Sequence, residues 1–323
     1  MKFVARILSA ALTLVASGWA AHAQETFPSR PVRVICAYVA GGGGDIMVRY
    51  WANALKNMTG QNFIVENRVG ANGHLGNRAA MEAKPDGYTM IITGTSALVG
   101  NPLMMKGAEY DPLNALQSVA TLNDIGLILV VNPASDIKTL ADLTAFIKAK
   151  KGEAKYAVAT ASHRVVSAWY LQLIGAEATA VGYKATSDAT NDIAGGLLDF
   201  VFADATLAMT QSRAGRARML ATSTKARVSF APDVPTMAEA GVPGLDYSVK
   251  WAAWLPKGTP EPIVKQMHAW LSEIAQRPES KKFLFEVGSD PYVLPTPAAM
   301  DAMIKHEYET WKDIVERAKI EKQ

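Results

Sequence analysis

A run of glycines near the beginning of the chain has the composition of an anion-binding turn. The segment from Tyr38 to Asp45 contains four consecutive glycines, Gly42 and Gly43 among them, and leads into a helical pattern that stops at Gly60. Glycines let the backbone approach a ligand closely, and the free N–H groups of a helix start carry the positive end of the helix dipole. We therefore expect this turn to bind a carboxylate or a phosphate.

Asp45 closes the glycine run and has two interpretations that can coexist. It stands where a helix N-cap belongs, so its carboxylate caps the helix, or it serves the ligand site. A phosphate-binding P-loop would need lysine followed by serine or threonine here, but Asp45-Ile46 follows the glycines. The dinucleotide fingerprint would need a glycine where Ile46 stands. A nucleotide site is not expected.

A second candidate turn lies in the middle of the chain, at Thr160-Ala161-Ser162-His163-Arg164. It follows an apolar strand pattern and opens a helix, so its N–H groups and the Ser162 hydroxyl can bind a carboxylate oxygen; the alternative is that Ser162 only caps the helix. Arg164 either pairs with a ligand carboxylate or lies exposed on the helix. The segment lacks the Gly-x-Ser-x-Gly elbow of many hydrolases, so catalysis is not expected.

Four further candidates lie at the ends of predicted strands. Thr95 and Ser96 follow the third strand, and Asp204 ends a later one, where it either accepts a hydrogen bond from the ligand or caps the next helix. Tyr183 offers an aromatic wall with a hydroxyl, or else packs in the core. The histidines stand on separate elements without metal-ligand spacing, so we expect no metal and no cofactor.

The elements that hold these residues follow an alternating order. Three strands and two helices fall within about 65 residues, which implies a parallel, right-handed doubly wound sheet whose ligands bind at the carboxyl ends of the strands. A second alternation begins at 127–131, and the last third of the chain is helical. The expected strands are 32–35, 62–65, 88–93, 127–131, 156–159, one ending at 181, 200–204, 219–222 and 249–255. The sequence thus predicts two α/β lobes, and the chain is expected to pass from one lobe to the other near 123–130 and again near 247–254.

The N-terminus and the composition limit the class of protein. Lys2, Arg6 and an apolar run before Ala21-His22-Ala23 predict a signal peptide over residues 1–23, cleaved after Ala23. Its removal would leave 31 basic against 30 acidic residues, so nothing favours nucleic acid. Cys36 has no partner for a disulfide and is expected in the core. No later run is long enough to span a membrane.

Several separate segments resemble one known family over the whole mature length: the periplasmic solute-binding receptors of tripartite tricarboxylate transporters, often called Bug receptors. The resemblance rests on the order and spacing of these segments. They are 28–33 (Pro-Ser-Arg-Pro-Val-Arg), the glycine turn ending at Asp45, 65–68 (Val-Glu-Asn-Arg), 84–89 (Lys-Pro-Asp-Gly-Tyr-Thr), 182–184 (Gly-Tyr-Lys), 195–199 (Gly-Gly-Leu-Leu-Asp) and 232–241 (Pro-Asp-Val-Pro-Thr-Met-Ala-Glu-Ala-Gly).

The resemblance implies a fold like that of type II periplasmic binding proteins, with two lobes closing on a small carboxylate. Its expected division is lobe 1 at 24–124, completed by 249–323, and lobe 2 at 125–248. It implies a monomer in the periplasm that works with membrane transporter subunits. The chain departs from the family at Val39-Ala40, where two prolines are usual, and in the shorter turn at 160–164.

The ligand is the least determined expectation. Helix starts on both lobes suit a carboxylate at each end, and Tyr38 with Tyr183 would sandwich a ring, so we favour an aromatic dicarboxylate such as terephthalate over aliphatic acids. Two other functions stay open. One is an exported hydrolase that uses the same cleft, and the other is a receptor that feeds a sensor kinase.

Overall fold

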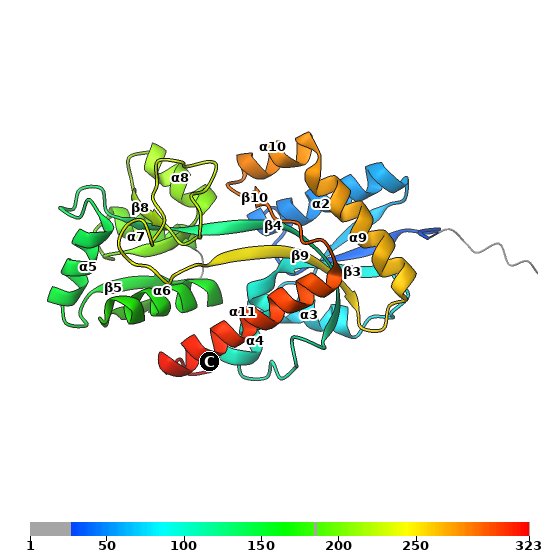
Figure 1. Ribbon diagram of the computed structural model, residues 1–323, viewed down its shortest axis with the longest axis horizontal. Helices are drawn as coiled ribbons and strands as arrows, with labels where there is room; N and C mark the ends of the chain where they lie inside the picture. The colour runs from blue at the N-terminus through cyan, green and yellow to red at the C-terminus, as the bar shows by residue number, and fades with distance from the viewer. Residues whose placement is uncertain (1–26, 184–185, 323) are drawn as a thin grey trace, which may run out of the picture.

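The computed structural model describes residues 27–183 and 186–322. The predicted signal peptide and its cleavage site, and Lys184 of the 182–184 segment, lie outside these residues. Figure 1 shows an elongated molecule in which two groups of α/β elements are joined by two long strands, β4 (Leu116–Val131) and β9 (Ser248–Pro256). The predicted two-lobed α/β architecture is confirmed.

The first lobe contains the parallel sheet that the sequence predicts. Its strands are β1 (Val32–Cys36), β2 (Phe63–Asn67) and β3 (Thr89–Gly94), and β1 pairs in parallel with both neighbours. Its helices are α2 (Gly43–Thr59) and α3 (His74–Met81), preceded by a 3₁₀ turn, η1 (Ala71–Gly73). Cys36 is buried, as expected, in a core that includes Trp51 and Leu55. Gly60 ends α2 in the left-handed conformation, which glycine adopts without strain.

The second lobe repeats the alternation with a different sheet. Strands β5 (Lys155–Val158) and β6 (Thr179–Gly182) pair in parallel, whereas β7 (Val201–Asp204) and β8 (Arg218–Thr222) pair antiparallel with the distal half of β4. The helices are α5 (Leu140–Ala149), α6 (Ala161–Ile174), α7 (Thr186–Ala194) and α8 (Ala205–Arg213). The predicted ranges of strands β5 to β8 agree with these to within a few residues.

Strand β4 begins eleven residues before the predicted strand at 127. The missed half contains polar residues, which break the apolar pattern, yet Thr121 and Asn123 are fully buried. Each is bonded to the C-terminal segment: Asn123 Nδ2 donates to Ser289 Oγ at 2.8 Å, although its Oδ1 has no partner among the described residues, and Thr121 Oγ1 accepts from the Leu294 N–H at 2.9 Å. Long-range hydrogen bonds therefore make these polar residues compatible with a buried strand.

Helix α4 (Thr95–Met104) follows β3 without a linker and was not predicted. Its N-cap is Gly94, so no capping side chain marks its start. Its residues are buried on nearly every side, which removes the polar face that would give a helical period. Thr95 and Ser96, expected in a loop, form its first turn.

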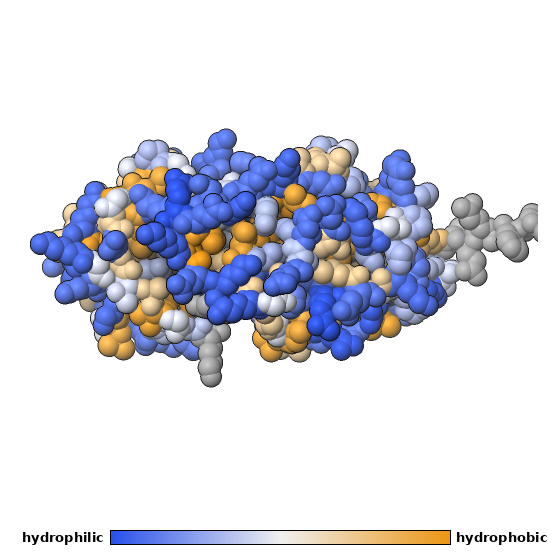
Figure 2. Space-filling view, turned by 90° about the horizontal axis from the view of Figure 1, so that it is seen from below, coloured by the Kyte–Doolittle hydropathy of each residue, from blue (hydrophilic) through white to orange (hydrophobic). Residues whose placement is uncertain are grey.

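The C-terminal third is helical, as predicted, and contacts both lobes. It comprises α9 (Glu261–Gln276), α10 (Pro278–Glu286), the short strand β10 (Asp290–Pro291) and α11 (Pro297–Arg317). Helix α11 packs on α4 and β4 and continues to α6, where Gln172 Nε2 donates to the Ile314 carbonyl at 3.4 Å. Seen from below in Figure 2, hydrophilic side chains cover most of the surface and hydrophobic ones gather near its middle. Among the described residues, no helix is long and apolar enough to cross a bilayer.

Candidate functional site

The glycine turn leads into α2, but its cap differs from the prediction. Gly42 is the N-cap residue, with extended backbone angles of φ −77° and ψ 167°, and α2 begins at Gly43. Asp45 lies in the first turn, so the expectation of an Asp45 N-cap is wrong. The N–H groups of Gly43 and Gly44 have no acceptor among the described residues, as the opening of a helix requires. They form an exposed donor site at the carboxyl edge of the first sheet.

The carboxylate of Asp45 is fully used within the protein. Its Oδ2 accepts from the Gly41 N–H at 2.9 Å and from Arg49 Nε at 2.7 Å, and its Oδ1 accepts from Asn67 Nδ2 at 2.7 Å. The bond from Arg49 comes first among the causes that hold its pKa far below the usual range. Asp45 is only 2% exposed, so it fixes the turn and does not face the ligand. Sequence reasoning missed Arg49 and Asn67, although Arg49 stands one helical turn after Asp45.

Tyr38 is part of the wall of lobe 1. Its hydroxyl lies 3.1 Å from Thr93 Oγ1 and accepts from the Gly94 N–H at 3.0 Å, while its ring centroid lies 5.0 Å from that of Trp251. Burial raises the pKa of the hydroxyl. A Cβ on Gly44 would lie 2.4 Å from Cγ of Tyr38, so only glycine fits there. The ring and hydroxyl of Tyr38 are therefore held by protein groups.

Thr95 is tied to the C-terminal helix and does not present its hydroxyl to the cleft. It is fully buried, and its Oγ1 donates to Oε1 of Glu307 at 2.9 Å. Burial raises the pKa of Glu307, whose other carboxyl oxygen has no partner among the described residues. Ser96 beside it is half-buried. Nothing in the sequence distinguishes Glu307 from the other charged residues of a long amphipathic helix.

The second turn forms the start of α6, with Thr160 as its N-cap. Thr160 Oγ1 accepts from the His163 N–H at 3.3 Å, so the predicted alternative of a Ser162 cap is wrong. The N–H groups of Ala161 and Ser162 have no acceptor among the described residues. His163 is 1% exposed, and neither ring nitrogen has a partner in the described chain. Burial lowers its pKa, against the opposing effect of Asp204, and favours the neutral imidazole.

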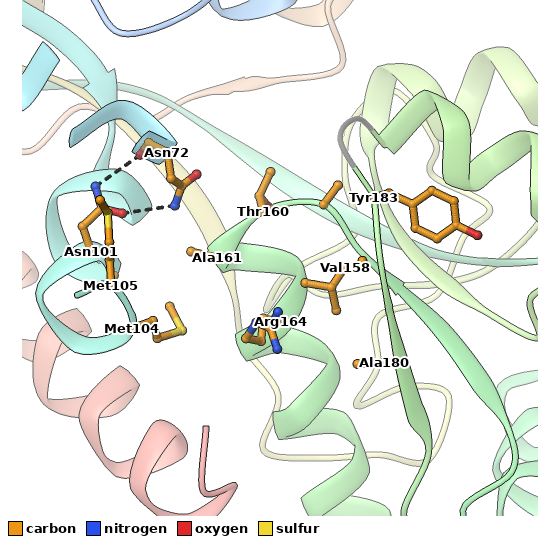
Figure 3. Close-up of a pocket in the computed structure, with 13 residues that line it drawn as sticks. Asn72, Asn101, Met104, Met105, Val158, Thr160, Ala161, Arg164, Ala180 and Tyr183 are labelled. Carbon is orange, nitrogen blue, oxygen red and sulfur yellow. Dashed lines mark hydrogen bonds between the residues drawn. The ribbon is translucent and has the colours of Figure 1, made fainter. Parts of the chain in front are cut away.

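A cleft of about 820 Å³ lies between the lobes (Figure 3). Lobe 1 contributes Asn72 of η1 and the end of α4, where Asn72 Nδ2 donates to Asn101 Oδ1 at 3.1 Å and Asn101 Nδ2 donates to the Asn72 carbonyl at 3.2 Å. Lobe 2 contributes the start of α6, including Thr160 and Arg164, and the ends of β5 and β6. Of the described residues that line the cleft, Arg164 is the charged one, and the others are polar or apolar.

Tyr183 and Asp204 lie on the lobe 2 side and differ in orientation. Tyr183 lines the cleft, but its ring points away from it, and its hydroxyl donates to Asp192 Oδ2 at 2.7 Å (Figure 3). Burial, followed by that hydrogen bond, raises its pKa to about 12. Asp204 is exposed at the end of β7 and is the N-cap residue of α8, as the capping alternative predicts, but its side chain makes no capping hydrogen bond. Its charge acts on both Tyr38 and His163, which places it near the boundary of the lobes.

The predicted site residues thus fall into three groups. The cleft brings together Thr160, Arg164 and the backbone of Tyr183. Tyr38, Asp45 and Thr95 are held by protein partners, whereas Gly42, Gly43, Ser96, Ser162, His163 and Asp204 lie at element ends beside the lobe boundary. Sequence reasoning missed Asn72, Asn101, Met104 and Met105 on the cleft wall. Asn72 lies between Gly70 and Gly73, a turn signal that the sequence carries, whereas the other three belong to the unpredicted helix α4 and its end. Among the described residues, no three metal-ligating side chains cluster.

Known proteins resemble this chain in sequence and in fold. Residues 47–320 match the model described as tripartite tricarboxylate transporter family receptor. The chain is 31% identical over 295 residues to the protein BugT of Bordetella pertussis, and the match covers 90% of each sequence. A solved structure from R. palustris with adipate has a TM-score of 0.82 at 26% identity and covers 92% of this chain and 100% of its own. A structure described as a periplasmic transporter has a TM-score of 0.80 at 30% identity, with 91% and 99% covered.

Proposed function

The chain belongs to the tripartite tricarboxylate transporter receptor family, and on that premise we propose that it is a periplasmic solute-binding protein. It captures a small carboxylate between its two lobes and delivers it to the membrane subunits of a transporter. The observation that carries this proposal is the start of α6. There, the unpaired N–H group of Ala161 and the cation of Arg164 lie together at the cleft between the lobes, and the unpaired N–H group of Ser162 follows in the same helical turn. Such a donor set binds a carboxylate oxygen.

The finer proposal is that the ligand is a dicarboxylate. The R. palustris protein with adipate supports an aliphatic diacid. Our expectation of terephthalate rested on a ring sandwich between Tyr38 and Tyr183, but Tyr38 is held by Thr93 and Gly94, and the Tyr183 ring points away from the cleft. We therefore rank an aliphatic dicarboxylate first. Terephthalate becomes the second candidate, with its ring against the sulfur atoms of Met104 and Met105.

The structure argues against the alternative of an exported hydrolase in one specific way. A histidine that acts as a general base is held by an acid that orients its ring. The ring of His163 has no such partner among the described residues. Delivery to a transporter, as opposed to a sensor kinase, rests on the family. Reconstitution of transport with the membrane subunits tests it.

Closure of the lobes is part of the proposed mechanism. We propose lobe 1 as 24–124 with 249–323 and lobe 2 as 125–248, in a monomeric protein. Contacts already join the lobes on the side of β10: Ser229 Oγ donates to Asp290 Oδ1 at 2.6 Å, and Thr206 Oγ1 donates to the Val287 carbonyl. Excluding water from the cleft strengthens every charge interaction inside it. Ligand should therefore favour this closed arrangement over an open one.

A thermal-shift screen of aromatic and aliphatic mono-, di- and tricarboxylates tests the proposal. A ligand at 100 times its dissociation constant adds about 2.7 kcal/mol to the free energy of unfolding, which is readily detected. Small-angle scattering should show a smaller radius of gyration with that ligand. Chromatography of the released ligand should recover it unchanged. A screen in which no carboxylate raises the melting temperature, or recovery of a hydrolysed product, would contradict the receptor proposal.

A further inference from the structure

Arg164 stands out in the cleft as a cation without a protein partner. It is half-buried, lines the cleft, and makes no hydrogen bond or ion pair with any described residue. Other arginines of the chain are satisfied: Arg49 by Asp45, and Arg218 by the carbonyls of Pro133, Ser135 and Ile137. A partly dehydrated guanidinium without an acceptor is unfavourable unless a ligand supplies one.

We propose that Arg164 binds the second carboxylate of a diacid and so makes this receptor select diacids over monoacids of the same chain length. This inference rests on the proposed function and deepens it, because it assigns a separate subsite to each end of the ligand. The first carboxylate occupies the N–H groups at the start of α6. The second reaches the planar guanidinium, which pairs with a carboxylate through two parallel hydrogen bonds.

The two subsites use different donors. Backbone N–H groups at the start of α6 form one, and the Arg164 guanidinium, on a long side chain four positions after the N-cap residue Thr160, forms the other. Two carboxylates can therefore bind without sharing donors, provided that a chain of carbon atoms joins them. The walls between them suit such a chain, since Met104, Met105 and Val158 line the same cleft.

Charge complementarity supports the same conclusion. Among the described residues that line the cleft there is no aspartate or glutamate, so none of them supplies a competing anion to the guanidinium. Asn72 lies on the opposite wall, from lobe 1, and its amide oxygen points toward the cleft in Figure 3. Its side-chain nitrogen is already committed to Asn101. The second anionic group of the ligand is therefore expected on the Arg164 side and not against lobe 1.

The experiment compares adipate with hexanoate, a diacid and a monoacid of six carbons. Titration calorimetry would measure both ligands on the wild-type chain, on Arg164→Met and on Arg164→Lys. We expect wild type to bind adipate at least 100-fold more tightly than hexanoate. Arg164→Met should lose about that factor for adipate while hexanoate changes less than threefold, and Arg164→Lys should fall between. Arg213→Met, an exposed arginine on α8 outside the cleft lining, is the matched control and should match wild type.

The outcomes separate this inference from the proposed function. If no carboxylate binds the wild-type protein, the receptor proposal itself fails. If adipate and hexanoate bind wild type equally, or Arg164→Met weakens both equally, the diacid subsite is refuted while the receptor proposal stands. Thermal melts of the unliganded variants establish that each is folded. Arg164→Lys keeps the charge and the stem, so it decides the question should Arg164→Met fail to fold.

Discussion

The two helix-start turns, 38–45 in lobe 1 and 160–164 in lobe 2, are built in opposite ways. In lobe 1, the side chain of Asp45 takes hydrogen bonds from Gly41, Arg49 and Asn67, so every side chain of the turn that carries a charge is satisfied by protein, and only backbone N–H groups stay open. In lobe 2, Arg164 and the ring of His163 have no hydrogen-bond partner among the described residues. A binding site must keep its shape without ligand and must also gain free energy when the ligand binds. The turn in lobe 1 meets the first requirement, and the turn in lobe 2 meets the second.

The difference extends to how each helix begins. Gly42 caps α2 with its backbone alone, whereas Thr160 caps α6 through its hydroxyl. The glycine start leaves room for a ligand, and the threonine start fixes the first turn by a local bond. We conclude that lobe 1 supplies a rigid frame and lobe 2 supplies the groups that discriminate between ligands. Four substitutions test this division.

The largest effect is expected from Gly44→Ala in the rigid frame. Its Cβ would lie 2.4 Å from the Tyr38 ring, which two hydrogen bonds and Trp251 hold in place, so we expect a loss of about 3 kcal/mol in the free energy of unfolding together with loss of binding. Gly43→Val is the matched control, because a Cβ on Gly43 meets no atom within 4 Å.

Urea unfolding and calorimetric titration measure both variants. Gly43→Val should fold with nearly wild-type stability but lose affinity, because its side chain extends into the space at the helix start. Wild-type affinity in a folded Gly43→Val protein would remove the first turn from the site. A stable Gly44→Ala protein would show that the Tyr38 ring can move to make room for the added Cβ.

The next effect is expected from Asp45→Ala. It leaves the donors of Gly41, Arg49 and Asn67 without their acceptor, at a cost of about 2 kcal/mol, reduced because Arg49 is half exposed to water. The pKa of Asp45 is lowered in the folded protein, so its stabilisation is present above about pH 4 and is lost as the pH falls below that. Urea unfolding at pH 3 and pH 7 should show the variant deficit shrinking at acid pH. An equal loss of stability at pH 3 and pH 7 would contradict the conclusion that the ionised Asp45 carboxylate stabilises the turn.

The sequence predicted those features that depend on local chemistry. The glycine start of α2, its stop at Gly60 and the alternation of strands and helices along the chain follow from backbone preferences and apolar patterns within a few residues. The missed features depend on distant partners: α4 and the first half of β4 are recognisable only once the elements that bury them are in place. The same holds for Tyr183, whose ring orientation is set by Asp192, and for Glu307, which meets Thr95 across more than 200 positions.

A smaller effect is expected from Thr160→Ala in the discriminating turn. Loss of the bond from the His163 N–H removes the side-chain cap of α6 and costs about 1 kcal/mol. Affinity should fall further than this stability loss implies, since the first turn also positions Arg164. Thr210→Ala is the control, because Thr210 is an exposed threonine of α8 outside the cleft lining, and its hydroxyl donates to the Thr206 carbonyl of its own helix and caps nothing. Thermal melting and calorimetric titration of both variants measure these effects. If the two variants lose stability and affinity equally, the Thr160 hydroxyl is not the cap that stabilises α6.

The smallest change in stability at neutral pH is expected from Glu307→Gln. This substitution tests whether the rigid part of lobe 1 includes helix α11. Glutamine keeps an oxygen to accept from Thr95 but cannot ionise. Burial raises the pKa of Glu307, while Lys250 and Thr95 oppose the shift, so its protonated form favours the folded state.

The sign follows from linkage. The contribution of Glu307 to stability is fully present below its unfolded pKa of about 4.3 and is lost as the pH rises through its raised folded pKa. Relative to wild type, Glu307→Gln should therefore gain stability between pH 4 and pH 8. Urea unfolding at several pH values across this range measures the difference. If the difference in the free energy of unfolding between the two proteins stays constant over this pH range, ionisation of Glu307 does not destabilise the folded state. In that case the contact with Thr95 is an ordinary hydrogen bond and not part of the buried frame.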